Sequence, residues 1–188
     1  TRMLSCFATS ECQTSGRARY LEAGRYWLQW AGAPTEVYRY SNGFNDYMDD
    51  YVSRGIRVNW LNQSSVNVPN KSGLGIPIDL ALGFHSDAGC KKDTIVGTLG
   101  IYTTQLTNED TKLIFPNGQS RYASRDLTDL VAMSIVNDMR KLYDPNWSFR
   151  GLWNKSYAES RRPEVPTMLL ELLSHQNFTD MQFGLDPR

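Results

Sequence analysis

Residues 76–84 read IPIDLALGF and lead straight into His85, while residues 163–171 read PEVPTMLLE and end on Glu171. The first stretch alternates apolar residues along one face, which is typical of a β-strand. In the second, Thr-Met-Leu-Leu predicts a strand over residues 167–170 that is buried on both faces, as in sheets covered by helices. Each strand carries an ionisable residue at its carboxyl end, where an open α/β sheet forms its ligand crevice. The two stretches therefore predict an α/β fold with its chemistry at that end of the sheet.

The rest of the chain alternates strand and helix patterns. Further strands are predicted over residues 37–40 and over the β-branched residues 94–104. Periodic apolar residues predict helices over residues 20–30 and 46–61, and a longer helix that begins with Ser124 as its N-cap and ends before Pro145. This alternation predicts a mixed, mostly parallel sheet flanked by helices.

Composition narrows the class of protein. The chain has 188 residues, 40% of them hydrophobic, which is enough for a core, and its 20 Lys and Arg balance its 20 Asp and Glu. This balance predicts no nucleic-acid partner. The sequence has no run of about 18 apolar residues, the length that a transmembrane helix needs, so no transmembrane segment is predicted. Residues 1–16 are small and polar and are interpreted as a lead-in segment. Cys6 and Cys12 either form a bridge that leaves Cys90 unpaired, or all three cysteines are free thiols.

Two residues carry the predicted chemistry. His85 follows an apolar strand and precedes small polar residues, a position suited to metal binding or acid–base work. The alternative is a histidine that only hydrogen-bonds to a loop. Glu171 follows a buried strand, where an unpaired carboxylate is costly, so it needs a metal, a cation or a catalytic task. Beside a zinc-bound water it would be a natural general base; the alternative is a salt bridge with Arg161 or Arg162.

Other polar residues give weaker signals. His175 lies four residues after Glu171, which would place both on one helix face. It is either a metal ligand or, as we favour, a cap for the turn that follows. Asp46, Asp49 and Asp50 resemble a calcium cluster, but their spacing lacks the glycine and terminal glutamate of a calcium loop, which favours a solvated helix face. Since the chain has no G-x-S-x-G nucleophile elbow, serine-hydrolase chemistry is weakly supported.

Several segments together resemble the type 3 N-acetylmuramoyl-L-alanine amidases. Arg150-Gly151-Leu152-Trp153, then residues 165–172 (VPTMLLEL), then Asn177 and Asp180, are similar to the end of that domain. There an Arg-Gly segment precedes a proline-initiated strand that ends on the catalytic glutamate.

Two upstream segments extend the resemblance. Residues 83–88 (GFHSDA) resemble the family's Ser-x-His-x-Asn-Ala motif, whose histidine binds zinc, with Gly83 and Asp87 in place of its Ser and Asn. Residues 49–59 (DDYVSRGIRVN) resemble the helix that bears Arg and Asn between the two motifs. The order and spacing agree over about residues 25–185, and the nearest likeness is to a divergent branch of long bacterial proteins often labelled xanthan-lyase-like.

The resemblance implies a zinc-dependent hydrolase. Its expected substrate is the amide between the muramoyl lactyl group and L-alanine of peptidoglycan, or a related cell-wall or glycan amide. His85 is implied as a zinc ligand and Glu171 as the catalytic base. Asp87, His175 and Arg150 are candidates for supporting the metal ligand or binding substrate. The implied location is the periplasm, the cell surface or the medium.

The family's zinc site takes a further His and a Glu from the first strand and helix of the domain. No histidine precedes His85 in this chain, and Glu22 is only a weak candidate for the glutamate. We therefore expect residues 17–188 to be the C-terminal portion of one amidase-like domain, with a missing N-terminal half as its partner.

Two other functions stay open. The first is a non-catalytic module that keeps the amidase fold and binds cell wall or polysaccharide, which predicts no stoichiometric zinc. The second is one half of a processed or split protein, which predicts an exposed apolar sheet edge.

Overall fold

The computed structural model describes residues 15–63, 72–88, 94–104 and 113–187. The chain divides into two compact units, Thr1–Pro77 and Ile78–Arg188. The three cysteines and nearly all of the predicted lead-in lie outside the described residues. None of the helices within the described ranges is both long enough and apolar enough to cross a bilayer.

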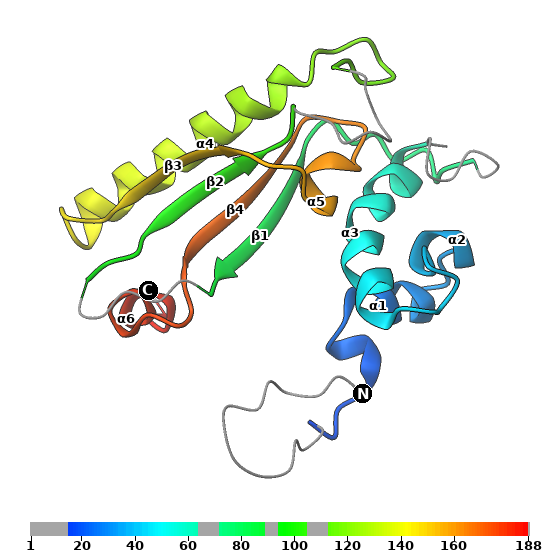
Figure 1. Cartoon of the computed structure of the whole chain (residues 1–188), viewed down its shortest axis with the longest axis horizontal. Coiled ribbons are helices and arrows are strands. Elements are labelled where there is room, and N and C mark those ends of the chain that lie inside the picture. The colour runs from blue at the N-terminus through cyan, green and yellow to red at the C-terminus, as the bar shows by residue number, and fades with distance from the viewer. Residues whose placement is uncertain (1–14, 64–71, 89–93, 105–112, 188) are drawn as a thin grey trace. The chain divides into compact units, whose positions relative to one another are not determined.

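The described part of the first unit is helical (Figure 1). It contains a 3-10 turn η1 (Arg19–Leu21) and the helices α1 (Gly24–Trp30), α2 (Thr35–Tyr38) and α3 (Asp46–Asn62). The predicted helix over residues 46–61 is confirmed as α3, and Asn45 caps it by accepting a hydrogen bond from the Met48 N–H. The helix predicted over residues 20–30 is broken into η1 and α1.

The strand predicted over residues 37–40 is wrong. Residues Thr35–Tyr38 form the short helix α2, which follows Pro34 and carries Glu36 in its first turn. Both residues favour a helix start, and Val37 is fully buried on the helix rather than in a strand. The β-branched Val37 was therefore a weaker signal than the residues that precede it.

The second unit contains a four-stranded mixed sheet in the order β1-β4-β2-β3. Its strands are β1 (Ala81–Asp87), β2 (Thr98–Tyr102), β3 (Phe149–Asn154) and β4 (Thr167–Ser174). β1 pairs parallel with β4 and β2 parallel with β3, while β2 and β4 are antiparallel. The prediction of a mixed, mostly parallel α/β sheet is confirmed.

The strand boundaries differ from those expected. β1 begins at Ala81, five residues later than predicted, where Ala81 pairs with Thr167 and its N–H donates to the Pro166 carbonyl. Pro166 has no N–H for a ladder bond, so pairing begins after it. β1 and β4 also run past their predicted ends, to Asp87 and Ser174. His85 and Glu171 therefore lie within strands rather than after them.

Three helices accompany this sheet: α4 (Tyr122–Leu142), α5 (Ala158–Arg161) and α6 (Phe178–Gly184). α4 runs along the sheet (Figure 1), and a Cβ placed on Gly100 of β2 would lie only 2.6 Å from Thr128 of α4, so glycine permits this close approach. Ser124 is not the N-cap of α4; it lies inside the first turn, where its buried Oγ accepts a hydrogen bond from the Thr167 N–H of β4. Ser124 thus joins the helix to the sheet.

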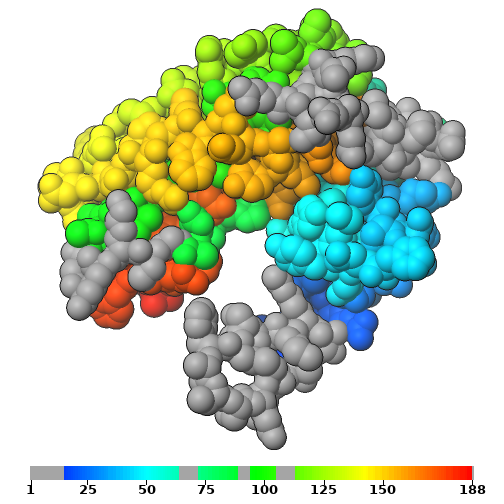
Figure 2. Space-filling view, in the orientation of Figure 1, coloured from blue at the N-terminus to red at the C-terminus, as the bar shows by residue number. Residues whose placement is uncertain are grey.

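Trp147 and Asp180 make the buried contacts that connect α4, α6 and β4 to the start of β2. Trp147 is fully buried with Val136 and Leu173, and its indole N–H donates to Thr98 Oγ1 at 2.9 Å. The Asp180 carboxylate, on α6, accepts from three buried backbone N–H groups, those of residues 96, 97 and 174. The space-filling view shows this red C-terminal segment against the green start of β2 (Figure 2). These contacts fix the carboxyl end of β4 next to the start of β2.

Candidate functional site

His85 and Glu171 are direct neighbours in the sheet. They are register partners on the parallel strands β1 and β4, so their side chains leave the sheet on the same face. The imidazole of His85 is 27% exposed and therefore accessible. The structure thus brings together the two residues that the sequence predicts as metal ligand and base, and whether they have those roles stays a prediction.

Glu171 has an unusual electrostatic setting. Its Oε2 is buried and has no hydrogen-bond partner among the described residues. Burial raises the pKa of the Glu171 carboxyl above its ordinary value; the charges of His85 and Arg150 oppose this rise, while those of Asp87 and Glu159 add to it. A carboxylate with a raised pKa is better able to take and return a proton near neutral pH.

The alternative of a salt bridge between Glu171 and Arg161 or Arg162 is not what the described residues show. Glu171 forms no ion pair there, and its buried oxygen lacks even a hydrogen-bond donor. A buried carboxyl oxygen without a partner is a feature found at ligand and catalytic sites, and the role of Glu171 as a base stays a prediction.

Arg150 and Asp87 join the same group of charges. Arg150 Nη2 lies 2.8 Å from Asp87 Oδ2, which links the start of β3 to the end of β1. Arg150 Nη1 is buried and has no hydrogen-bond partner in the described part of the chain. The group therefore contains one unsatisfied donor, on Arg150, and one unsatisfied acceptor, on Glu171, as a site for a polar ligand would.

His175 is placed in the turn after β4. The helical alignment of His175 with Glu171 is wrong, because β4 continues through Ser174. His175 Nδ1 lies 3.1 Å from both the Oγ and the carbonyl oxygen of Ser86, and the His175 N–H donates to the Asp87 carbonyl at 2.9 Å. These contacts tie the turn to the end of β1, and the predicted capping of the turn that follows, like a role in metal binding, stays a prediction.

Glu159 is a further member of the group that sequence reasoning missed. Its Oε2 lies 2.6 Å from His85 Nε2, and its side chain is only 14% exposed. Glu159 belongs to α5, 74 residues from His85 in the sequence, within a polar stretch without periodicity. No local pattern marks it; the one related signal is Gly83, whose lack of a side chain leaves room for this carboxylate.

The metal-binding capacity of the described residues is limited. They contain no group of three or more His, Cys, Asp or Glu side chains placed to hold a metal ion. What they do contain is an imidazole with a carboxylate hydrogen-bonded to one ring nitrogen, the usual setting of a metal-binding histidine. This donor set fits one ligand of a zinc site whose other ligands come from elsewhere, and zinc itself stays a prediction.

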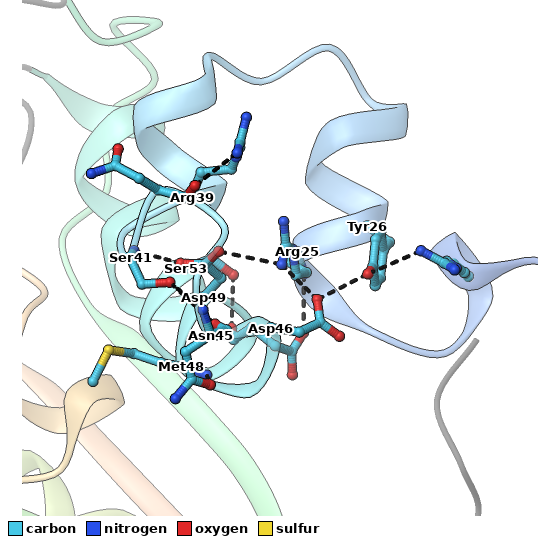
Figure 3. Close-up of polar contacts among 12 residues, drawn as sticks. Arg25, Tyr26, Arg39, Ser41, Asn45, Asp46, Met48, Asp49 and Ser53 are labelled. Carbon is cyan, nitrogen blue, oxygen red and sulfur yellow. Dashed lines mark hydrogen bonds and ion pairs between the residues drawn. The ribbon is translucent and has the colours of Figure 1, made fainter.

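Glu22, the weak metal candidate, belongs to the first unit. Its Oε2 is buried with no hydrogen-bond partner among the residues described, and it lines a pocket of about 210 Å³ with Tyr26, Asp46 and Asp50. The neighbouring polar network is drawn in Figure 3, where the Tyr26 hydroxyl donates to Asp46 Oδ1 at 2.9 Å. His85 belongs to the other unit, and a metal role for Glu22 stays a prediction.

The aspartates of α3 differ from the solvated helix face that the sequence favoured. Asp46 is exposed, but Asp49 and Asp50 are buried. The Arg25 guanidinium pairs with Asp46 and Asp49, and Arg54 Nη2 lies 2.7 Å from Asp50 Oδ2 (Figure 3 shows the Arg25 contacts). Arg25 and Arg54 thus neutralise these carboxylates, which offsets the cost of burying Asp49 and Asp50.

Comparisons with known proteins give a distant likeness among solved structures. No protein-family profile matches the chain, and no curated protein matches it. Among solved structures, the N-acetylmuramoyl-L-alanine amidase from Clostridium difficile 630 is similar, with a TM-score of 0.46 and 16% identity over 81% of this chain and 69% of that chain. At this level the likeness concerns the α/β fold alone.

Proposed function

We propose that this chain carries the base and one metal ligand of a zinc-dependent hydrolase that cleaves the lactyl–L-alanine amide of peptidoglycan, or a related cell-wall or glycan amide. The observation that carries the proposal is Glu171, a partly buried carboxyl with an unpartnered buried oxygen and a raised pKa, next to His85 in the sheet. The motifs around both residues, which resemble those of the type 3 amidases, supply the reaction class. The enzyme would act in the periplasm, at the cell surface or outside the cell.

Each residue then has a distinct task. His85 would hold the zinc, which when bound polarises a carbonyl and lowers the pKa of a water molecule. Glu171 takes the proton of the attacking water and returns it to the leaving amine, a cycle that its raised pKa favours. Arg150, held by Asp87, offers its unpartnered Nη1 to an anionic or carbonyl oxygen of the substrate.

The test is hydrolysis of purified peptidoglycan, read by mass spectrometry as peptides with a free L-alanine amino group. Glu171→Gln keeps the shape of the side chain but cannot accept the proton, so we expect a loss of about 10²–10⁴-fold in rate. Asp138→Asn, an exposed carboxylate on α4, serves as the matched control and keeps full activity. A Glu171→Gln variant with wild-type activity would exclude Glu171 as the base.

A second candidate is that the chain forms one half of a split domain. β1 lies at the edge of the sheet, and its apolar residues Leu82 and Phe84 are 56% and 64% exposed. An exposed apolar edge strand is suited to pairing with further chain, here the proposed N-terminal half that would bring the remaining zinc ligands. Replacing both residues with threonine would leave folding intact and abolish co-purification of that half; unchanged co-purification would reject this candidate.

A further inference from the structure

We propose that Glu159 is the residue that positions His85, by accepting a hydrogen bond from the imidazole Nε2–H. The two atoms are 2.6 Å apart, and both side chains are largely shielded, at 14% exposed for Glu159 and 27% for His85. A hydrogen bond with a charged partner in such a place is stronger than a surface ion pair. Its consequence for zinc rests on the proposed function, since a metal-binding histidine commonly donates its other ring N–H to a carboxylate.

Hydrogen bonds hold the backbone on both sides of Glu159, and this restricts the positions that its carboxylate can take. Ser160, the next residue, is buried, and its Oγ lies 2.7 Å from Oγ1 of Thr103, the residue directly after β2. Thr103 Oγ1 in turn donates to the Lys155 carbonyl at 2.6 Å, and Arg121 donates to the Arg161 carbonyl at 3.1 Å. The segment on both sides of Glu159 is therefore fixed to the rest of the unit.

Gly83 provides independent support. A Cβ at residue 83 would lie 2.9 Å from Glu159 Oε2 and 3.5 Å from His85 Nε2. Gly83 is not among the described glycines with a positive φ, so its backbone conformation does not demand glycine. Glycine at residue 83 thus leaves the room that the Glu159 carboxylate occupies beside the His85 ring, and a side chain there would have to displace that carboxylate.

The tautomer of the His85 ring tests directly whether Glu159 accepts its hydrogen bond. The chain has only two histidines, so a ¹⁵N spectrum of the imidazoles contains two rings, and His175 is the internal control. In zinc-free protein, at a pH where the imidazole is neutral and carries a single N–H, the wild-type His85 ring should carry that proton on Nε2. Glu159→Ala should release it to a mixture of tautomers, while Glu159→Gln, which keeps an acceptor oxygen, should largely preserve it.

Gly83→Ala is a second variant that leaves the carboxylate in the chain but displaces it from the ring, and it should reproduce the Glu159→Ala spectrum. Asp138→Asn should change nothing. A His85 ring that keeps the Nε2–H tautomer in both Glu159→Ala and Gly83→Ala, while the protein stays folded, would overturn the proposal.

Zinc affinity, measured by competition with a coloured chelator, separates this inference from the proposed function. We expect Glu159→Ala to weaken binding by roughly 10- to 100-fold and Glu159→Gln by less. Unchanged affinity in Glu159→Ala would overturn the role in metal binding. A wild type that binds no zinc, with ring spectra that change as expected, would show that Glu159 positions His85. In that case the proposed zinc-dependent hydrolase function is rejected.

Discussion

Glu171→Gln should stabilise the second unit at neutral pH. The buried Oε2 of Glu171 has no hydrogen-bond partner among the described residues, and burial raises the pKa of its carboxyl. The ionised form is therefore disfavoured in the folded protein. Glutamine resembles the neutral acid, so the variant avoids the cost of holding a charge there.

The expected size follows from the partial burial of this side chain. A buried polar group without a partner costs about 1–3 kcal/mol, and for a partly buried carboxylate we expect the lower end, about 1 kcal/mol. In a chain of this length such a gain corresponds to a rise in Tm of roughly 2–4 °C. Loss of catalysis with gain of stability is common for residues kept for a reaction.

The effect should depend on pH in one direction. Below about pH 4.5, the ordinary value for this group, the carboxyl is protonated in both folded and unfolded chains, and wild type and variant should be equally stable in this respect. As pH rises, the unfolded chain loses the proton first, so the wild type loses stability relative to Glu171→Gln. The difference stops growing once the pH has passed the raised pKa of the folded protein.

Hydrogen exchange of β4 amides reports on the stability of the second unit, because β4 belongs to that unit. Wild type and Glu171→Gln are compared at equal pH, with Asp138→Asn as the control for losing one carboxylate. A variant that is less stable than wild type at pH 7, or a difference that is the same at pH 4 and pH 7, would show that the buried charge of Glu171 does not destabilise the wild type.

Two further predictions concern buried charges with a structural task. Asp180→Ala leaves three buried backbone N–H groups without an acceptor. The free energy of unfolding of the second unit, measured by urea titration, should therefore fall by about 3 kcal/mol or more. An unchanged free energy of unfolding would show that water replaces the carboxylate. Arg25→Met leaves the fully buried Asp49 without its cation and should lower the free energy of unfolding of the first unit by about 3–5 kcal/mol. On heating, helical circular dichroism should then be lost at a lower temperature than in the wild type. A melting curve identical to that of the wild type would mean that the ion pair between Arg25 and Asp49 is not needed for stability.

The fold class could be predicted from strong local patterns. β4 was recognisable because uninterrupted apolar residues without turn signals leave few alternatives, and α3 because its polar and apolar residues follow the helical period. β3 was missed, since FRGLWN has no regular alternation and Gly151 has a φ of +96°; it becomes a strand only by pairing with β2. Such pairing depends on distant residues, which no local pattern contains.

The residues of the candidate site could be predicted only in part. Strand ends pointed to His85 and Glu171, but the register that makes them partners is a property of the assembled sheet. Glu159 had no signal of its own, because a glutamate in a polar stretch is ordinary until the fold places it against an imidazole. The burial of Asp49 was likewise hidden, since its partner Arg25 lies on another helix.

The central claim is that His85 binds zinc next to Glu171, and metal content tests it most directly. Inductively coupled plasma mass spectrometry would be applied to the wild-type protein, with any polypeptide that co-purifies, and to His85→Ala and Glu171→Gln. We expect about one zinc per chain in the wild type and in Glu171→Gln, and none in His85→Ala. Absence of zinc from the wild type, or full retention in His85→Ala, would contradict it and leave the wall-binding module as the better explanation.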